Sequence, residues 1–149
     1  MAKFRVPRKI MKFKLSKTKC TECRLCQLAC SAVKDGSYSV QQARIRILCS
    51  SKRKAPEIVV CRQCKRSKCI DACQYGAFKK NEKSGGVYID FEGCQACFVC
   101  IDACPFGGVT LNPKNKLPMV CDLCGGHPFC VDLCTRGAIL GIEATVGSD

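Results

Sequence analysis

Residues 94–104 read CQACFVCIDAC, and their four cysteines follow the spacing C-x2-C-x2-C-x3-C. Three of these cysteines fall within seven residues, so one tight loop can direct them toward one centre. The last two, Cys100 and Cys104, are separated by one helical turn, which places them on the same face of a short helix. The stretch therefore predicts a metal-binding loop that runs directly into a helix.

The same unit occurs four times, which makes the chain an internal repeat. Each copy is a run of four cysteines that closes with C-x3-C. The four runs are Cys20, Cys23, Cys26 and Cys30; Cys61, Cys64, Cys69 and Cys73; Cys94, Cys97, Cys100 and Cys104; and Cys121, Cys124, Cys130 and Cys134. Runs one and three share the spacing above, whereas runs two and four have four and five residues before their third cysteine.

The segments around the runs predict short helices and short strands, which gives an α+β fold class. Each C-x3-C segment is expected to form one helical turn, and we expect glycines to end three of these helices, at Gly76, Gly107 and Gly137. Alternating apolar residues and small-residue turns predict strands at 11–15, 44–48, 77–79, 87–90, 109–111 and 138–140. Residues 80–86, KNEKSGG, predict the turn of a hairpin.

The composition indicates metal thiolates in a reducing compartment. Cysteine accounts for 17 of the 149 residues, an odd number, and tryptophan is absent. Residues 1–19 lack the apolar run of a secretory signal, and no stretch approaches the roughly 20 apolar residues that span a bilayer. Disulfides are therefore disfavoured, and we expect a cytoplasmic protein with no membrane span.

Iron–sulfur clusters and zinc are the two metal options that the cysteines leave. Either metal brings the formal charge of +13 to about +5, because a 2+ cluster core or Zn²⁺ held by four thiolates carries −2. The spacing favours clusters, since structural zinc sites typically use two separated C-x2-C pairs. In C-x2-C-x2-C-x3-C runs, the fourth cysteine serves the other cluster of a pair. We therefore predict four [4Fe–4S] clusters held by sixteen of the cysteines.

The chain resembles the four-cluster, double-ferredoxin electron-transfer subunits of multi-subunit oxidoreductases. The stretches CRQCKRSKCIDAC, CQACFVCIDACPFG and CDLCGGHPFCVDLC carry this resemblance, which extends over about residues 20–140. The family includes the iron–sulfur subunits of formate dehydrogenase, dimethyl sulfoxide reductase and tungsten aldehyde oxidoreductase. Among its members, the chain is most similar to the compact subunits of soluble tungsten enzymes, including benzoyl-CoA reductases. Only Cys104 is followed by proline, a departure that removes no ligand.

The resemblance implies a nested pairing of the runs, one with four and two with three. The implied ligand sets are Cys20, Cys23, Cys26 and Cys134; Cys121, Cys124, Cys130 and Cys30; Cys61, Cys64, Cys69 and Cys104; and Cys94, Cys97, Cys100 and Cys73. It further implies two pseudo-symmetric ferredoxin-like modules, one formed by 20–60 with 105–149 and one by 61–104, after a basic arm and strand at 1–19. From the residues alone, pairing one with two and three with four stays open.

The resemblance also implies the function, which is to relay electrons between a catalytic subunit and an electron acceptor or donor. A tungsto- or molybdopterin enzyme is the expected catalytic partner, with a flavin subunit or a ferredoxin as a further partner. The chain shows no acid–base pair or nucleophile, so we expect no catalysis by it alone. Two alternatives are a free polyferredoxin shuttle and, more remotely, a zinc-dependent module that binds nucleic acid.

Several residues outside the ligand sets carry weaker expectations. Cys49, the seventeenth cysteine, is expected to be a packed thiol, and His127 a loop residue rather than a ligand. Four aromatic residues are expected to shield the clusters from water: Tyr75, Phe98, Phe106 and Phe129. The arm at 1–19 holds eight lysines and arginines between apolar residues, which favours docking onto a protein over nucleic acid.

Overall fold

The computed structural model describes residues 10–49, 51, 52 and 54–143, so residues 1–9 of the basic arm lie outside the described residues. Its eight strands form four antiparallel pairs rather than one sheet. The pairs are β1 (Ile10–Leu15) with β8 (Ile139–Glu143), β2 (Arg46–Leu48) with β3 (Glu57–Val59), β4 (Phe78–Lys80) with β5 (Val87–Ile89), and β6 (Val109–Leu111) with β7 (Pro118–Val120). A small mixed fold of short strands and helices was predicted and is confirmed.

Helices lie where each cysteine run closes. They are α1 (Leu25–Asp35), α2 (Lys68–Asp71), α3 (Val99–Ala103) and α4 (Phe129–Asp132). Short 3-10 turns occupy Lys17–Lys19 (η1), Val40–Gln42 (η2) and Leu123–Gly126 (η3). Only α1 exceeds two helical turns, because its run is followed by CSAVKD rather than by a small-residue turn. The third cysteine of each run lies inside its helix and the fourth inside it or just beyond its end.

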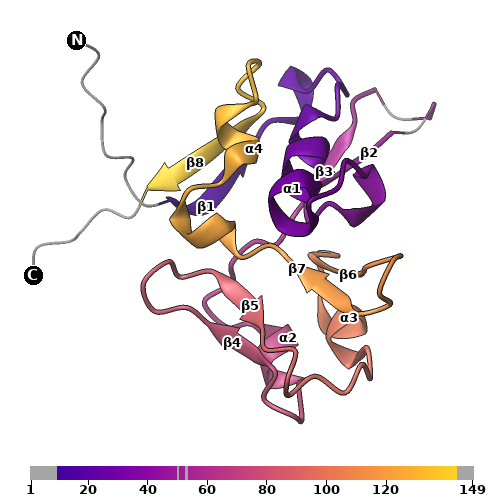
Figure 1. Ribbon diagram of the computed structural model, residues 1–149. Coiled ribbons are helices and arrows are strands. Elements are labelled where there is room, and N and C mark those ends of the chain that lie inside the picture. The colour runs from indigo at the N-terminus through magenta and orange to yellow at the C-terminus, as the bar shows by residue number, and fades with distance from the viewer. Residues whose placement is uncertain (1–9, 50, 53, 144–149) are drawn as a thin grey trace, which may run out of the picture.

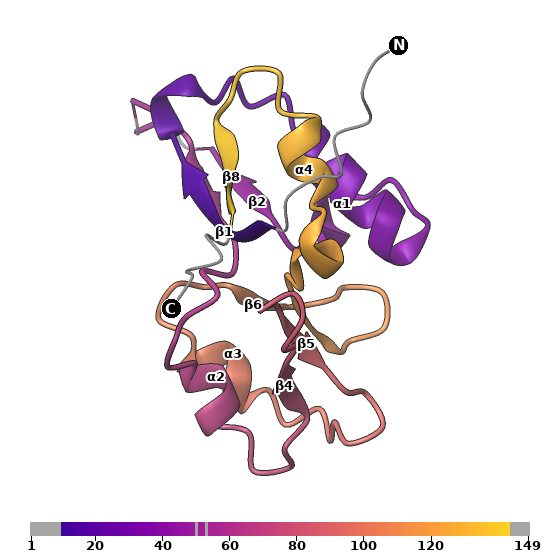
Figure 2. The same cartoon turned by 90° about the vertical axis from the view of Figure 1, so that its left-hand side faces the viewer.

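The elements gather in two groups (Figures 1 and 2). In one group, α1 contacts α4, and the β1–β8 pair joins the two ends of the described chain. In the other, α2 contacts α3, while β6 lies against α3 and β7 against β5. Helices from runs one and four are therefore neighbours, as are helices from runs two and three.

Asparagine side chains fix two of the hairpin turns. In the β4–β5 turn, Asn81 Oδ1 accepts from the backbone N–H groups of Lys83 and Ser84, at 2.9 and 3.0 Å. In the β6–β7 turn, Asn112 Oδ1 accepts from the N–H of Lys114 at 2.9 Å. Asparagine favours turns because its side chain can bond the backbone two residues on. The predicted turn at 80–86 is thus confirmed.

The role predicted for Gly76, Gly107 and Gly137 needs correction. Their helices end earlier, and each glycine instead closes the turn that follows a fourth cysteine. The glycine N–H donates to the carbonyl of Cys73, Cys104 or Cys134, at 3.2, 3.3 and 2.9 Å respectively. All three have φ between 61° and 63°, the left-handed region that favours glycine. The turn leads the chain back into a strand.

The core is small and cysteine-rich. Ile45, Val87, Val109, Leu123 and Ile139 are at most 2% exposed. Six cysteines are buried with them in the same cluster: Cys26, Cys61, Cys69, Cys100, Cys121 and Cys130. On β1, Phe13 and Leu15 pack against this core while Lys12 and Lys14 are exposed, which confirms the predicted half-exposed strand. Among the described residues, no helix is both long and apolar enough to cross a bilayer.

Candidate metal centres

Four hollows are each lined by four cysteines that come from two different runs. We name them by the run that supplies three of the four. Site 1 has Cys20, Cys23, Cys26 and Cys134; site 2 has Cys61, Cys64, Cys69 and Cys104; site 3 has Cys94, Cys97, Cys100 and Cys73; site 4 has Cys121, Cys124, Cys130 and Cys30. In every site, the fourth cysteine arrives from the C-x3-C helix of the paired run.

The loops that present these cysteines share a strained backbone feature. The residue before the second cysteine of each run has positive φ although none is glycine: Glu22 (59°), Gln63 (50°), Ala96 (51°) and Leu123 (61°). Each such residue costs about 1–2 kcal/mol in the left-handed region. Successive N–H groups in this conformation form a concavity that binds anions and is found at many iron–sulfur sites. None of the four positions is a glycine that could signal this conformation, and the four share only their place in the repeat.

Backbone N–H groups converge on the sulfurs. The N–H groups of Gln63 and Leu123, two of the left-handed residues, lower the pKa of Cys61 and Cys121 against the larger opposing effect of burial. The N–H of Arg44 donates to Cys30 Sγ at 3.2 Å, and that of Gly108 to Cys104 Sγ at 3.3 Å. These donors favour sulfur in its anionic thiolate form, which is the form that ligates metal.

Burial and mutual repulsion act in the opposite direction. The pKa of Cys26 is raised to about 12, chiefly by burial and in part by the neighbouring Cys23, Cys20 and Cys134 of site 1. Burial likewise raises the pKa of Cys61 and of Cys100 to about 11, again assisted by members of their own sites. Four thiolates can therefore share such a hollow only around a cationic centre that offsets their repulsion.

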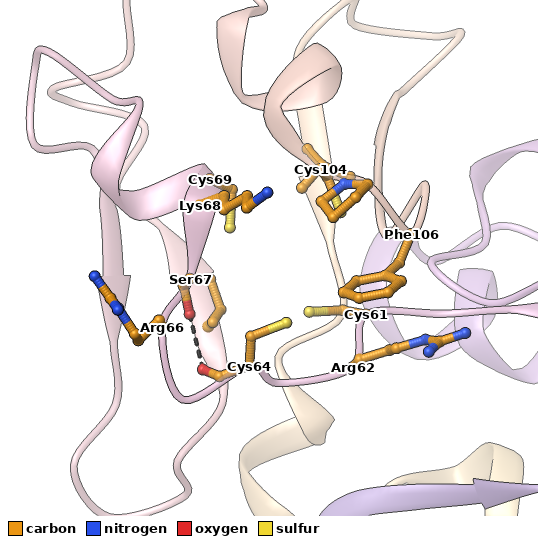
Figure 3. A pocket seen from close by; sticks show the side chains of 12 residues that line it. Cys61, Arg62, Cys64, Arg66, Ser67, Lys68, Cys69, Cys104 and Phe106 are labelled. Atoms are coloured by element: carbon orange, nitrogen blue, oxygen red, sulfur yellow. Dashed lines mark hydrogen bonds between the residues drawn. The ribbon is translucent and has the colours of Figure 1, made fainter.

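The donor sets fit a cluster better than a single ion. Among the described residues, no group of three or more histidine, cysteine or carboxylate side chains is arranged to hold one metal ion. A structural zinc site requires four donors within about 2.3 Å of one point. Here the cysteines instead surround hollows, as Figure 3 shows for site 2, where the sulfurs of Cys61, Cys64, Cys69 and Cys104 face a common space. The residues present thus fit [4Fe–4S] groups.

The remaining candidate residues behave differently from one another. Cys49 is exposed, and the guanidinium of Arg24 donates to its sulfur at 3.7 Å, so the predicted packed thiol was wrong. It directly follows Leu48, the last residue of β2. His127 is exposed and does not line site 4. The four predicted shielding aromatics each line a site but remain 37–52% exposed, so they cover the hollows only in part.

The sites form a continuous series. Burial is the main cause that raises the pKa of Cys130 in site 4, but the nearby charge of Cys26 in site 1 also raises it. In the same way, burial and, to a smaller extent, the nearby charge of Cys61 in site 2 raise the pKa of Cys121 in site 4. Site 2 takes its fourth cysteine, Cys104, from just beyond the end of α3, and site 3 takes its fourth, Cys73, from just beyond the end of α2. These two helices contact each other. The spatial order is therefore 1–4–2–3, with the step between the two groups of elements falling between Cys121 and Cys61.

Gln63 bridges that step. Its side chain is 3% exposed, and its Nε2 donates to the carbonyl of Cys121 at 2.6 Å. Its Oε1 accepts from the N–H of Val87 at 2.9 Å, which ties β5 to the same point. Close backbone contact between Gly86 and Asp122 leaves no room for a side chain there. Sites 4 and 2 are thus held at a fixed separation by buried hydrogen bonds.

Substitution of Gly108 by alanine is expected to destabilise site 2. A Cβ there would lie 2.8 Å from the Cα of Cys61, a backbone atom that cannot yield without moving the ligand. Overpacking of this kind costs about 1–3 kcal/mol, which corresponds to roughly 2–12 °C in the melting temperature of a chain this size. Anaerobic thermal melts of the iron-loaded protein measure the effect. Gly93→Ala is the control, since a Cβ there meets only ordinary contacts from 3.7 Å. Equal melting temperatures for the two variants would contradict the prediction.

Comparisons with known proteins place these sites in context. Residues 55–143 match a family described as the 4Fe-4S dicluster domain. The chain is 39% identical over 133 residues to the polyferredoxin-like subunit of an aliphatic sulfonate oxidoreductase from Pyrococcus furiosus, covering 87% of this chain and 75% of that protein. It is 34% identical over 123 residues to subunit beta of an NADH-dependent phenylglyoxylate dehydrogenase from Aromatoleum evansii, but spans only 28% of that subunit's length.

A solved structure gives the same picture. The active-site complex BamBC of benzoyl coenzyme A reductase, with benzoyl-CoA bound, contains a chain that matches with a TM-score of 0.54 and 26% identity. The match covers 93% of this chain and 83% of that one. The same complex as isolated gives a TM-score of 0.55.

Proposed function

Because this chain belongs to the 4Fe-4S dicluster domain family, we propose that it is a relay subunit whose four [4Fe–4S] clusters carry electrons to or from a catalytic oxidoreductase subunit. The family match confirms [4Fe–4S] clusters as the cofactor that the cysteines predicted. The number of clusters, their ligands and the identity of the partner are parts of the proposal.

The convergence of cysteines from two runs on each of four hollows is the observation that carries this proposal. Each hollow supplies the four sulfur ligands that a [4Fe–4S] cluster takes. We therefore assign one cluster to each of sites 1 to 4, with the ligands given above. The same convergence supports two pseudo-symmetric modules, one built on runs one and four and one on runs two and three.

The clusters, when bound, supply one-electron redox chemistry. The chain holds the clusters in place and provides the side chains and N–H groups that surround them. Backbone N–H groups stabilise the thiolate ligands, and apolar side chains such as Val87 and Val109 at site 2 limit access of water. Gln63 fixes the step from site 4 to site 2. The order 1–4–2–3 then offers a single path from one end of the molecule to the other.

A tungsten or molybdenum enzyme of the cytoplasm is the partner that we propose. The relative in P. furiosus is a subunit of an aliphatic sulfonate oxidoreductase, and the matched structure is the active-site complex of benzoyl coenzyme A reductase. The first name describes a polyferredoxin-like subunit of an oxidoreductase, and the second describes a complex of a reductase. We propose a division of labour here in which the catalytic chemistry belongs to the partner.

Isolation of the native protein under anaerobic conditions tests this proposal. We expect it to elute with a larger subunit that contains tungsten or molybdenum, and added substrate of that subunit to bleach the visible absorbance of the clusters. Recovery of the chain as a lone monomer that exchanges electrons with several unrelated enzymes would instead establish a free polyferredoxin shuttle.

A further inference from the structure

The segment between Cys61 and Cys69 of run two is strongly basic. It includes four cationic residues within seven positions and no acid: Arg62, Lys65, Arg66 and Lys68. We call these four residues the basic loop. All four are exposed, and Arg62, Arg66 and Lys68 line site 2 directly. Lys80 adds a fifth cation beside it, since its Nζ donates to the carbonyl of Cys64 at 2.8 Å.

Site 2 also has the largest hollow of the four sites. This hollow has a volume of about 270 Å³, and the basic loop forms one margin of it (Figure 3). Phe106 stands across the hollow from Arg66 (Figure 3), and the guanidinium of Arg62 lies 4.2 Å from its ring centroid. Positive side chains therefore line the largest of the four hollows.

Arg62 of the basic loop makes a cation–π contact with the ring of Phe106. No ion pair joins any of the loop's four cations to a carboxylate in the part of the chain that the structure describes. At site 4, by contrast, Lys34 pairs with Asp122 at 2.6 Å, and Arg44 pairs with Asp35. Site 3 is lined by no charged residue at all. Site 1 is lined by two exposed arginines, Arg24 and Arg136, and site 2 by three exposed cations, so site 2 has the most positive lining of the four sites among the described residues.

We propose that the basic loop is the docking surface for an acidic one-electron carrier protein of the ferredoxin or flavodoxin type. This inference rests on the relay function proposed above and identifies site 2 as the place where electrons are exchanged with the carrier. In each encounter, the reduced carrier loses one electron and the relay chain gains one, or the reverse; no bond is formed or broken. Complementary charge would steer the acidic carrier toward site 2.

A protein carrier fits this surface better than a nucleic acid does. Nucleic-acid surfaces combine cations with aromatic faces that stack on bases. Phe106 is the only aromatic residue that lines site 2 among the described residues, and Arg62 already covers its ring. The remaining loop side chains offer charge without stacking, as electrostatic steering requires.

Charge reversal in the basic loop tests the proposal. The test variant is Arg66→Glu with Lys68→Glu, and the matched control is Lys114→Glu with Lys116→Glu. The control lysines are exposed in the β6–β7 turn and do not line site 2. Both variants alter net charge equally. Iron content and the absorbance near roughly 400 nm establish that each variant carries its full set of clusters.

Stopped-flow reduction by a reduced, strongly acidic bacterial ferredoxin is the readout. Because steering changes association rates by about 10- to 1,000-fold, we expect the test variant to be reduced at least about tenfold more slowly than wild type at low salt. The control should lose much less than tenfold, and added salt should slow wild type while leaving the test variant nearly unchanged. Equal losses in the two variants, or tight binding of single-stranded nucleic acid that the test variant alone abolishes, would overturn the proposal.

Reduction by methyl viologen radical separates this inference from the relay function. This small cationic donor needs no docking surface, so wild type and both variants should be bleached at similar rates. Failure of viologen to reduce wild type would count against the relay itself. Normal viologen reduction with no effect of the test variant on the ferredoxin rate would leave the relay intact and refute docking at the basic loop.

Discussion

Removal of the iron is expected to unfold the chain. The described structure holds four separate strand pairs, and an isolated two-stranded hairpin is marginally stable in water at best. Helices α2, α3 and α4 have only four or five residues each, far below the length at which a helix is stable alone. Six of the buried core residues are themselves cysteines of sites 1 to 4. Cluster binding must therefore supply most of the stability, as it does in other small metal domains.

Circular dichroism after anaerobic chelation measures this effect. We expect the helical signal and the dispersion of the amide NMR spectrum to be lost together with the visible absorbance. Reconstitution with iron and sulfide should restore all three, which distinguishes unfolding from oxidative damage. An iron-free chain that keeps the native dichroism spectrum and melts cooperatively would show that the apolar core suffices without the clusters.

Cys61→Ala is expected to remove one cluster and divide the series of sites. Cys61 lines site 2 and lies next to Cys121 of site 4, at the step between the two groups of elements. Alanine cannot ligate iron, so the iron content should fall from about sixteen to about twelve atoms per chain, the content of three four-iron clusters. Sites 1 and 4 would then be separated from site 3 by a gap.

Cys49→Ala is the matched control for that variant. Cys49 is exposed and lines none of the four sites, so its loss should leave the iron content and the spectrum unchanged. Iron and sulfide analysis and EPR of the dithionite-reduced proteins give the comparison. The ligand assignment is contradicted by a Cys61→Ala protein that retains all of its iron, or by a Cys49→Ala protein that loses a quarter of it.

The cysteine spacing predicted the helices, and the alternation of apolar residues together with small-residue turns predicted six of the eight strands of the described chain. The C-x3-C rule located α1 to α4, and the strand at 109–111 was predicted with the bounds that the structure gives. The strand expected at 44–48 forms only from Arg46, because Ala43 is buried and Arg44 turns to pair with Asp35 and to donate to Cys30. Local alternation carries no information about such tertiary contacts.

Other features of the sites could not be predicted from the spacing of the cysteines. The left-handed residues Glu22, Gln63 and Leu123 are of types that rarely signal positive φ, since the loop geometry rather than residue preference imposes it. The pairing of runs depends on long-range packing of α1 on α4 and α2 on α3, which spacing within one run cannot specify. The bridging role of Gln63 could not be predicted either, because it depends on a hydrogen bond to Cys121, which is distant in the sequence.

Iron and acid-labile sulfide analysis of the anaerobically purified chain, with EPR after dithionite reduction, tests the central claim most directly. Four cubanes predict about sixteen iron atoms and about sixteen sulfides per chain, and interacting paramagnetic signals from the reduced clusters. A colourless chain that contains zinc, has no labile sulfide and stays EPR-silent after reduction would contradict it.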